Sequence, residues 1–464
     1  MEKVRTENKM GYMPEGRLLF GMSLPVVISM LTQALYNVID SIFVTRLSED
    51  ALTAVSLAFP IQMLMIAVAV GTGIGMNALI SRRLGERRFE DANTAAGNGL
   101  FLLFVSSMAF LLFGLFGVKP FFDAFVSESP AIRDMGMDYL SICCVLSFGI
   151  FLQMGAERIM QAQGKTVFVM LMQITGALVN IVLDPLLIFG LCGFPKLGVA
   201  GAAYATVGGQ FAAMVLSFLL VFCTRHDIRL HWRHVRPSGA VIRQIYAVGL
   251  PSIIMQSIGT IMNLIMNALL IAYTTTAVAV FGVYFKIQSL VFMPVFGMTS
   301  AAMSILAFNY GARCKRRMER TFRLTLLSSL AIMTLGMLCF QLFPAEIFSI
   351  FDDSAEALRI GVVALRTISP GFVLAAVSIA CSILFQAVNR GFYSMFLSLA
   401  RQLFVLVPAA MLLSLFTHDL DRIWLAFPIA EVACFIISLC LLRRVNRTIL
   451  APLCSEPAEP AGNA

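Results

Sequence analysis

The sequence predicts an all-α polytopic membrane protein, with twelve transmembrane helices in two pseudo-symmetric bundles of six. Three observations predict this class: the composition, the recurrence of long apolar segments and an internal repeat. Of the 464 residues, 59% are hydrophobic and 13% are charged, and the mean hydropathy is +0.86. A soluble protein carries about 25% charged residues. A transmembrane β-barrel would show alternating segments of about 10 residues, which this sequence lacks.

Twelve apolar segments that are long enough to cross a bilayer follow one another along the chain. A helix needs about 20 apolar residues to span the hydrocarbon core, and charged or Gly/Pro-rich joints separate the segments. The predicted spans are 17–45, 52–81, 94–117, 135–157, 167–190, 197–223, 244–271, 277–309, 322–345, 358–387, 393–416 and 423–442.

Charge orients these spans. Lys and Arg crowd into the two tails and the even-numbered loops, as in RRLGERR at 82–88, whereas the odd-numbered loops hold single cations such as Lys119 and Lys196. The positive-inside rule therefore predicts a multi-pass protein of the plasma (inner) membrane with both termini in the cytoplasm. Nothing aromatic interleaves the basic loops as a nucleic-acid surface would require, so no nucleic-acid partner is expected.

The two halves of the sequence repeat in one register. Six spans separate the copies, so both halves face the same way, which is typical of transporters built from parallel repeats. The pairs at an offset of 226 residues are Pro25 and Pro251, Asn37 and Asn263, Gly71 and Gly297, and Gly85 and Gly311; QAQGK at 161–165 matches QAVNR at 386–390 at an offset of 225.

This register predicts the domains. Residues 1–223 form an N-lobe of six spans, 224–243 a basic cytoplasmic linker, and 244–450 a C-lobe of six spans. The Pro/Ala-rich tail at 451–464 is expected to be disordered.

The first span carries polar residues that lipid does not tolerate. Gln33, Asn37 and Asp40 stand at i, i+4 and i+7, so they share one helix face, and Tyr36 lies beside them. A charged Asp near the middle of a membrane costs about 2.5–3.5 kcal/mol on insertion scales. Partners or a function must offset that cost.

The fifth span repeats the pattern with Gln173, Asn180 and Asp184 on one face. A structural hydrogen-bond network between helices explains the amides. It does not explain two carboxylates, because neighbouring like charges repel each other. Asp40 and Asp184 therefore indicate a proton carrier or a cation site, and Na⁺ at Asp40, Asn180 and Asp184 stays open beside H⁺.

Two prolines accompany these faces. Pro25 precedes Asp40 by about four turns and Pro185 follows Asp184 directly. A proline inside a helix removes one backbone hydrogen bond. Static kinks and kinks that bend when Asp40 changes charge are both compatible with this placement.

The repeat also shows where the acids are absent. The positions that correspond to Asp40 and Asp184 in the second half are Met266 and Ala409. The ion-coupling role is therefore expected of the N-lobe, and the C-lobe is expected to shape the substrate cavity. Candidate cavity residues in the C-lobe are Gln256, Asn263, Lys286 and Glu431.

Several motifs in this order are similar to those of a known family. They are LP…Q…N…D in the first span, GTGIGMNALISRRLGE after the second, QAQGK after the fourth, NIVLDPLLIFG in the fifth, and LGVAGAAYATVGGQ leading into the sixth. Over roughly residues 15–445 the chain resembles the multidrug and toxic compound extrusion (MATE) transporters. The resemblance implies two bundles around a central cleft that opens alternately to either side, and export of organic cations and amphipathic drugs against inward proton or sodium flow.

By matching motif, the resemblance implies a coupling site of Tyr36, Asp40, Asn180, Asp184 and Thr206. The pattern looks like the DinF-like branch. It departs from the NorM-like branch, whose seventh and tenth spans carry acids, because spans 244–271 and 358–387 hold no carboxylate here.

We therefore predict a secondary active multidrug efflux antiporter that works by alternating access. The alternative is a flippase for lipids or lipid-linked precursors, which should show a strongly cationic cavity. A membrane enzyme is not expected, because the spans hold no Gly-x-Ser-x-Gly or paired-His motif. The expected partners are small cationic or amphipathic drugs and the lipid bilayer, with no cofactor apart from the coupling ion, and the expected state is a monomer.

Overall fold

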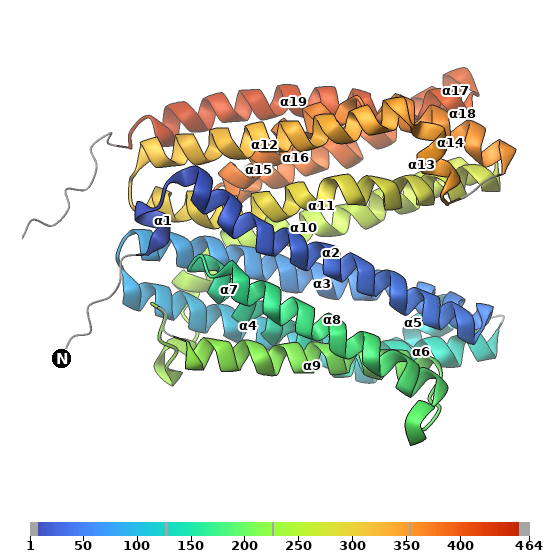
Figure 1. Cartoon of the computed structure of the whole chain (residues 1–464), viewed down its shortest axis with the longest axis horizontal. Helices are drawn as coiled ribbons and strands as arrows, with labels where there is room; N and C mark the ends of the chain where they lie inside the picture. Colours follow the sequence, from blue (N-terminus) through green and yellow to red (C-terminus); the bar gives the residue numbers. More distant parts are fainter. Residues whose placement is uncertain (1–7, 126–128, 225–226, 352–353, 454–464) are drawn as a thin grey trace, which may run out of the picture. The chain divides into compact units, whose positions relative to one another are not determined.

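The computed structural model describes residues 8–125, 129–224, 227–351 and 354–453, and every regular element within these ranges is helical (Figure 1). Of the tail that is expected to be disordered, residues 454–464 lie outside the described residues. The chain divides into two compact units, one comprising Met1–Lys9 and Leu24–Ile253, the other Met10–Ser23 and Ile254–Ala464. We call them unit 1 and unit 2.

Unit 1 holds the helices of the first half. They are α2 (Glu15–Leu47) from Leu24 onward, α3 (Glu49–Gly85), α4 (Phe89–Phe116), α5 (Val118–Phe125), α6 (Pro130–Val145), α7 (Phe148–Ala162), α8 (Thr166–Phe189), the short η1 (Leu191–Gly193), α9 (Val199–Cys223), η2 (Trp232–Val235), and the start of α10 (Gly239–Ile271).

Unit 2 holds the rest. Its helices are most of α1 (Lys9–Tyr12), the first turns of α2, the end of α10, α11 (Thr275–Gly311), α12 (Lys315–Leu342), α13 (Pro344–Ser349), α14 (Ala355–Ile368), α15 (Gly371–Ala387), α16 (Gly391–Leu399), the π-helical η3 (Ala400–Leu406), α17 (Val407–Thr417), α18 (Leu420–Ile423), α19 (Ala426–Val445) and η4 (Asn446–Leu450).

The described helices account for ten spans, or for twelve if each of two bent pairs is one span. Ten are long and apolar enough to cross a membrane as single segments, and two further spans are pairs bent at a break: α6 with α7 by 43°, and α14 with α15 by 52°. The prediction of an all-α membrane protein with twelve spans is confirmed. The bends were not expected within 135–157 and 358–387. In the second pair Pro370 stands at the break, where its missing N–H removes a helical hydrogen bond.

The internal repeat reappears in the backbone. Short helix α5 precedes the first bent pair, and α13 precedes the second. Residues that adopt the left-handed conformation, which side chains rarely favour, recur at the same offsets of 226 or 225. The pairs are Arg87 (φ 58°) with Arg313 (φ 56°), Cys192 (φ 58°) with His418 (φ 49°), and Gly164 (φ 79°) with Asn389 (φ 62°).

Packing repeats as well. A Cβ on Gly136 of α6 would lie 2.4 Å from the ring of Phe122 in α5, and a Cβ on Gly361 of α14 would lie 2.5 Å from the ring of Phe348 in α13. The N-caps of α3 and α11 are also equivalent, because both carry a side-chain hydroxyl that accepts a backbone N–H, Ser48 in one and Thr274 in the other. The two halves therefore fold by the same local rules.

Helices α2 and α10 each belong to both units. The division falls between Ser23 and Leu24 in α2 and between Ile253 and Ile254 in α10, next to the equivalent prolines Pro25 and Pro251. A helix interior that lacks one hydrogen bond bends more readily. The prolines thus mark where each helix passes from one unit to the other.

The basic segment 224–243, expected as a linker, is held against α4. The amide of the fully buried Asn98 donates to the carbonyl oxygens of His234 (3.1 Å) and Arg236 (3.2 Å) and accepts from the backbone N–H of Ser238 at 2.8 Å. Gly97 allows this approach, since a Cβ there would lie 2.3 Å from the His234 carbonyl oxygen.

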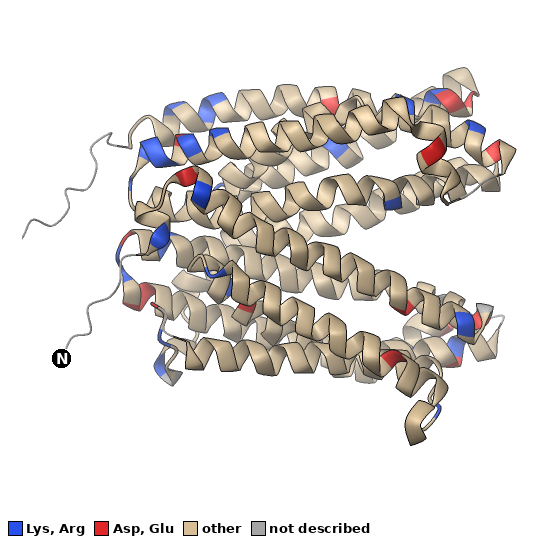
Figure 2. Ribbon diagram, in the orientation of Figure 1, with Lys and Arg blue, Asp and Glu red and all other residues tan. Residues whose placement is uncertain are grey.

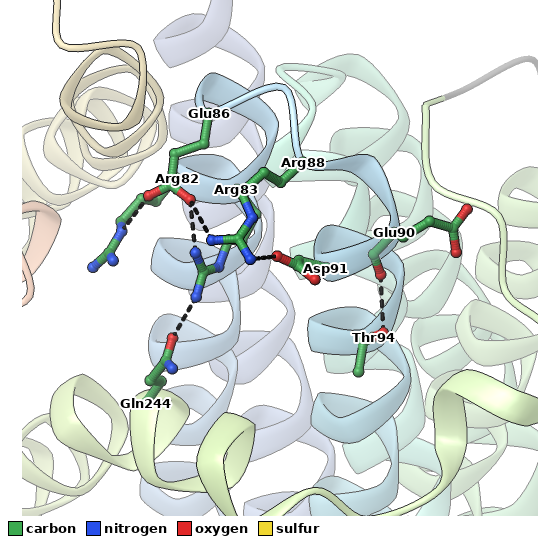
Figure 3. Close-up of polar contacts among 8 residues, drawn as sticks. All are labelled: Arg82, Arg83, Glu86, Arg88, Glu90, Asp91, Thr94 and Gln244. Atoms are coloured by element: carbon green, nitrogen blue, oxygen red, sulfur yellow. Dashed lines mark hydrogen bonds and ion pairs between the residues drawn. The ribbon is translucent and has the colours of Figure 1, made fainter.

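Charged residues gather at the ends of the helices (Figure 2). At the turn after α3, Glu86 accepts from Arg82 at 3.0 Å and from Arg83 at 2.7 Å, and Arg83 also donates to Gln244 of α10 at 3.0 Å (Figure 3). Partial burial opposes the charge of Glu86, but the hydrogen bonds and positive charges of the two arginines outweigh it, so the pKa of Glu86 is lowered.

Candidate functional site

Small residues bring α8 and α9 into close contact. A Cβ on Gly209 of α9 would lie 2.6 Å from the carbonyl oxygen of Gly176 and 3.0 Å from the Cβ of Asn180, both in α8. A Cβ on Gly201, nearer the start of α9, would lie 2.4 Å from the carbonyl oxygen of Leu187. Only glycine permits such close backbones, and this contact sets the position of Asn180 against α9.

Asn180 connects Asp184 to Thr206. With its amide nitrogen toward Asp184, Asn180 donates to Oδ2 of that carboxyl at 3.3 Å, and its oxygen accepts from the backbone N–H of Thr206 at 3.2 Å. The opposite orientation offers only a 3.4 Å contact between the amide nitrogen and Thr206 Oγ1. We adopt the first orientation because it satisfies both amide groups.

Asp40 of α2 lies within electrostatic range of Asp184 of α8. The two carboxyls interact electrostatically with each other, and both interact with the hydroxyl of Tyr36. Asp184 is fully buried, and in the described part of the chain Oδ1 of Asp184 and Oδ1 of Asp40 are buried without a hydrogen-bond partner. An unpartnered buried carboxylate oxygen is costly, so these oxygens are where a proton or a cation would be stabilised.

Helix α6 closes the other side of Asp40. Tyr139 and Cys143 of α6 lie within electrostatic range of this carboxyl. Gln62 of α3 donates to the Tyr139 hydroxyl at 3.2 Å and so holds it in place.

A polar cavity of about 60 Å³ lies within unit 1, and two of its lining residues, Tyr36 and Asn180, stand one helical turn before Asp40 and Asp184. It combines amide and hydroxyl groups with a few apolar side chains, and its volume suits ordered water. Its lining includes five of the residues predicted from the sequence: Gln33, Tyr36, Gln173, Asn180 and Thr206.

Three of the predicted polar residues, Asn37, Asp40 and Asp184, do not line this cavity. Asn37 is exposed on α2. Pro25 is buried in α2, and Pro185 lies in α8 directly after Asp184.

A third carboxyl near the cavity, Glu157, was missed from the sequence. It is 3% exposed on α7 and accepts from Gln153 at 2.9 Å and from Gln173 at 2.9 Å. The predicted span 135–157 ends at this residue, to which no role was assigned. Helix α7 continues to Ala162. The spacing of Gln153 and Glu157 at i and i+4 is the signal that could have revealed it.

The C-lobe candidates differ in their surroundings. Gln256 and Lys286 are exposed, and the amide of Asn263 donates to Gly259 of its own helix at 3.0 Å. Glu431 pairs with Arg401 at 3.7 Å and interacts with the buried Tyr284 hydroxyl. Arg401 stands in the π-helical turn η3, so its charge is satisfied inside unit 2.

Comparisons with known proteins identify the relatives of this architecture. A family model described as MatE matches residues 25–186 and again 251–412. The second match begins and ends 226 residues after the first, in the register that the sequence predicts.

Individual proteins match over nearly the whole chain. The FAD transporter of Shewanella oneidensis is 25% identical over 438 residues, which cover 94% of this chain and 96% of that protein. The multidrug export protein MepA of Staphylococcus haemolyticus is 24% identical, with coverage of 90% and 91%. The structure of a multidrug resistance MATE family transporter of the MOP superfamily, in an outward-facing conformation, superposes with a TM-score of 0.90 at 26% identity, covering 97% of this chain and 99% of that one.

Proposed function

The chain belongs to the MatE family, and on that premise we propose that it is a secondary active multidrug exporter. It releases organic cations and other amphipathic drugs to the outside as protons flow inward, with Asp40 and Asp184 as the coupling site. The observation that carries this proposal is a pair of carboxyls that interact electrostatically, the buried Asp184 and the half-buried Asp40, each with a buried oxygen that has no hydrogen-bond partner among the described residues. The similarity to MepA and to a multidrug resistance transporter supports the drug substrates.

Proton binding would change the contact between α2 and α8. Two ionised carboxylates repel each other, whereas one protonated carboxyl can donate a hydrogen bond to its neighbour. A proton that enters from outside would draw Asp40 toward Asp184 and favour bending of α2 near Pro25. Because coupling between two binding events is reciprocal, bound drug would weaken proton binding by the same factor.

Proton and sodium coupling require different orientations of Asn180. With protons its amide nitrogen can face Asp184, whereas a Na⁺ ion between Asp40 and Asp184 would require the amide oxygen to face the ion. A sodium site of Asp40, Asn180 and Asp184 would therefore need this amide to turn and to give up its hydrogen bond from Thr206.

Reconstituted protein tests the proposal. Ethidium flux is measured in proteoliposomes under separate pH and Na⁺ gradients, together with the dissipation of the imposed gradient on adding drug. Wild type should couple ethidium movement to the pH gradient alone, and Asp40→Asn should abolish the coupling. If Asp40→Asn still dissipates the gradient by drug exchange, the assignment of Asp40 is wrong.

One comparison supports a second candidate. The relative from Shewanella oneidensis, which matches over 94% of this chain, is named a FAD transporter. A flavin dinucleotide is also amphipathic, so the same vesicles should be tested with FAD. Movement of FAD without ethidium movement would favour the dinucleotide, and a change in phospholipid sidedness would favour the flippase alternative.

Orientation and assembly complete the proposal. Both termini would lie in the cytoplasm, because the Arg-rich turn after α3 and the basic segment 224–243 then face inward. A monomeric state and the DinF-like branch stay predictions.

A further inference from the structure

Glu157 is buried between two glutamines that line the cavity. Its Oε1 accepts from Nε2 of Gln153, one turn earlier on α7, and its Oε2 accepts from Nε2 of Gln173 on α8. Gln153 and Gln173 both line the 60 Å³ cavity of unit 1, whereas Glu157 lies behind them. Both oxygens of one carboxylate are thus used to hold two amides.

This arrangement determines which way the amides point. An ionised carboxylate has acceptors only, so each glutamine must turn its NH₂ group toward Glu157. The carbonyl oxygens are then directed away from Glu157, and neither accepts a hydrogen bond from another residue in the part of the chain that the structure describes. The cavity is therefore offered two acceptors from these amides.

The neighbouring Arg158 does not neutralise Glu157 by forming an ion pair with it. Arg158 follows Glu157 on α7, but its guanidinium donates to Gln161 at 2.6 Å and contacts the sulfur of Met154 at 3.6 Å. Its side chain packs against α3, where a Cβ on Gly73 would lie 2.9 Å from Arg158 Cγ. No ion pair within 4.0 Å joins Arg158 to Glu157 among the described residues.

We propose that Glu157 determines the substrate specificity of the cavity, by orienting Gln153 and Gln173 so that their carbonyl oxygens receive substrates whose cationic group carries N–H donors. Glu157 is a positioning residue in this scheme, since it acts through the two amides. The inference rests on the proposed drug export and adds the class of cation: primary, secondary or tertiary ammonium and aryl-amine groups are favoured over cations without N–H.

The substitution Glu157→Gln reverses one amide. The new side chain presents one NH₂ group in place of a carboxylate oxygen. Whichever of Gln153 and Gln173 faces this group must turn its own amide oxygen toward residue 157 and its NH₂ group toward the cavity. An N–H donor of the cavity then faces the N–H donor of the substrate, and no hydrogen bond can form between them. An unpaired or opposed hydrogen bond to a charged group costs about 1.5–3 kcal/mol, or roughly tenfold or more in affinity.

Two cationic dyes separate this effect from loss of charge. Uptake into proteoliposomes driven by a pH gradient is measured with ethidium, which carries N–H groups, and with tetraphenylphosphonium, which has none. Glu157→Gln should raise the KM for ethidium by about tenfold and change that for tetraphenylphosphonium by less than about threefold. Glu157→Asp, which keeps the two acceptors, should retain the preference of the wild type for ethidium.

Gln173→Met provides a second variant should Glu157→Gln fold poorly. It removes one cavity acceptor and leaves the negative charge in place, so it too should weaken ethidium selectively. Equal losses for both dyes would show that Glu157 acts through charge alone, and unchanged selectivity in both variants would show a purely structural bridge between α7 and α8. Either result overturns the inference. Failure of wild type to move either dye would instead overturn the proposed export.

Discussion

The amide of Asn180 joins Asp184 to the backbone of Thr206, with 3.3 Å from the amide nitrogen to Asp184 Oδ2 and 3.2 Å from the amide oxygen to the Thr206 nitrogen. One side chain therefore connects the buried carboxyl of α8 to helix α9. The contact with α9 holds the amide nitrogen of Asn180 toward Asp184, where it stabilises the charged carboxylate. The protonation state of Asp184 is therefore coupled to the packing of α8 against α9.

Substitutions of Asn180 and of Thr206 should differ in their effect on transport. Asn180→Leu removes the donor to a charged carboxylate, which is worth about 1.5–3 kcal/mol, so pH-driven ethidium transport should fall about tenfold or more. Thr206→Val keeps the backbone N–H that Asn180 uses and should reduce transport by less than about twofold. A severe loss in Thr206→Val alone would show that Asn180 uses the Thr206 hydroxyl and faces the other way.

The glycines of α9 allow a neighbouring pair of variants to be compared. Gly209→Ala places a methyl group against the backbone oxygen of Gly176 and against Asn180, so it should lower stability by about 1–3 kcal/mol and impair transport. Gly208→Ala meets only Cδ1 of Leu183, at 2.7 Å, and a leucine methyl can move aside. Thermal unfolding in detergent should therefore shift strongly for Gly209→Ala and weakly for Gly208→Ala.

The prolines of α2 and α10 should differ although they are equivalent in the repeat. Pro25→Ala restores an N–H in the helix that carries Asp40, straightens α2, and should slow transport at least severalfold while ethidium binding persists. Pro251→Ala changes the helix in which Met266 takes the place of Asp40, so its effect should be smaller. Equal transport rates in Pro25→Ala and wild type would argue against bending of α2 in the cycle.

The turn after α3 predicts a pH-dependent contribution to stability. The pKa of Glu86 is below its ordinary value of 4.5 in the folded protein, so its carboxylate stabilises the fold above about pH 4.5, and this contribution is lost as the pH falls through the lower folded value. Glu86→Gln should therefore cost about 0.5–1 kcal/mol at pH 7. The difference from wild type should shrink on acidification below pH 4.5 when melting temperatures are compared.

A matched control is available for this measurement. Glu319 has a single ion pair, with Lys315 at 3.9 Å, and its side chain is 54% exposed. Glu319→Gln should leave the melting temperature unchanged at both pH values. A similar shift in Glu319→Gln would mean that the loss in Glu86→Gln reflects general surface charge.

The spans and the acidic pair could be predicted because they depend on local periodicity. Asp40 and Asp184 each lie on a polar face that recurs at helical spacing, and helices in a bundle turn polar faces inward. The 226-residue register likewise depends on residue identity alone, and turns such as those at Arg87 and Arg313 follow it.

Features that depend on span ends or on tertiary pairing could not be predicted. Glu157 stands at the end of the predicted span 135–157, where the apolar run stops, and hydrogen bonds from Gln153 and Gln173 let α7 continue with the carboxyl buried. The pairing of Arg401 with Glu431 joins residues thirty positions apart in the sequence, and helix packing alone brings them together.

Proton release on drug binding tests the coupling of Asp40 and Asp184 most directly. Ethidium is added to purified protein in weakly buffered detergent solution near neutral pH, and the change in pH is recorded. Reciprocal coupling predicts that wild type releases protons on binding drug, and that Asp40→Asn combined with Asp184→Asn binds drug without releasing them. Proton release of the wild-type size from the double variant would contradict the assignment of these two carboxyls as the coupling site.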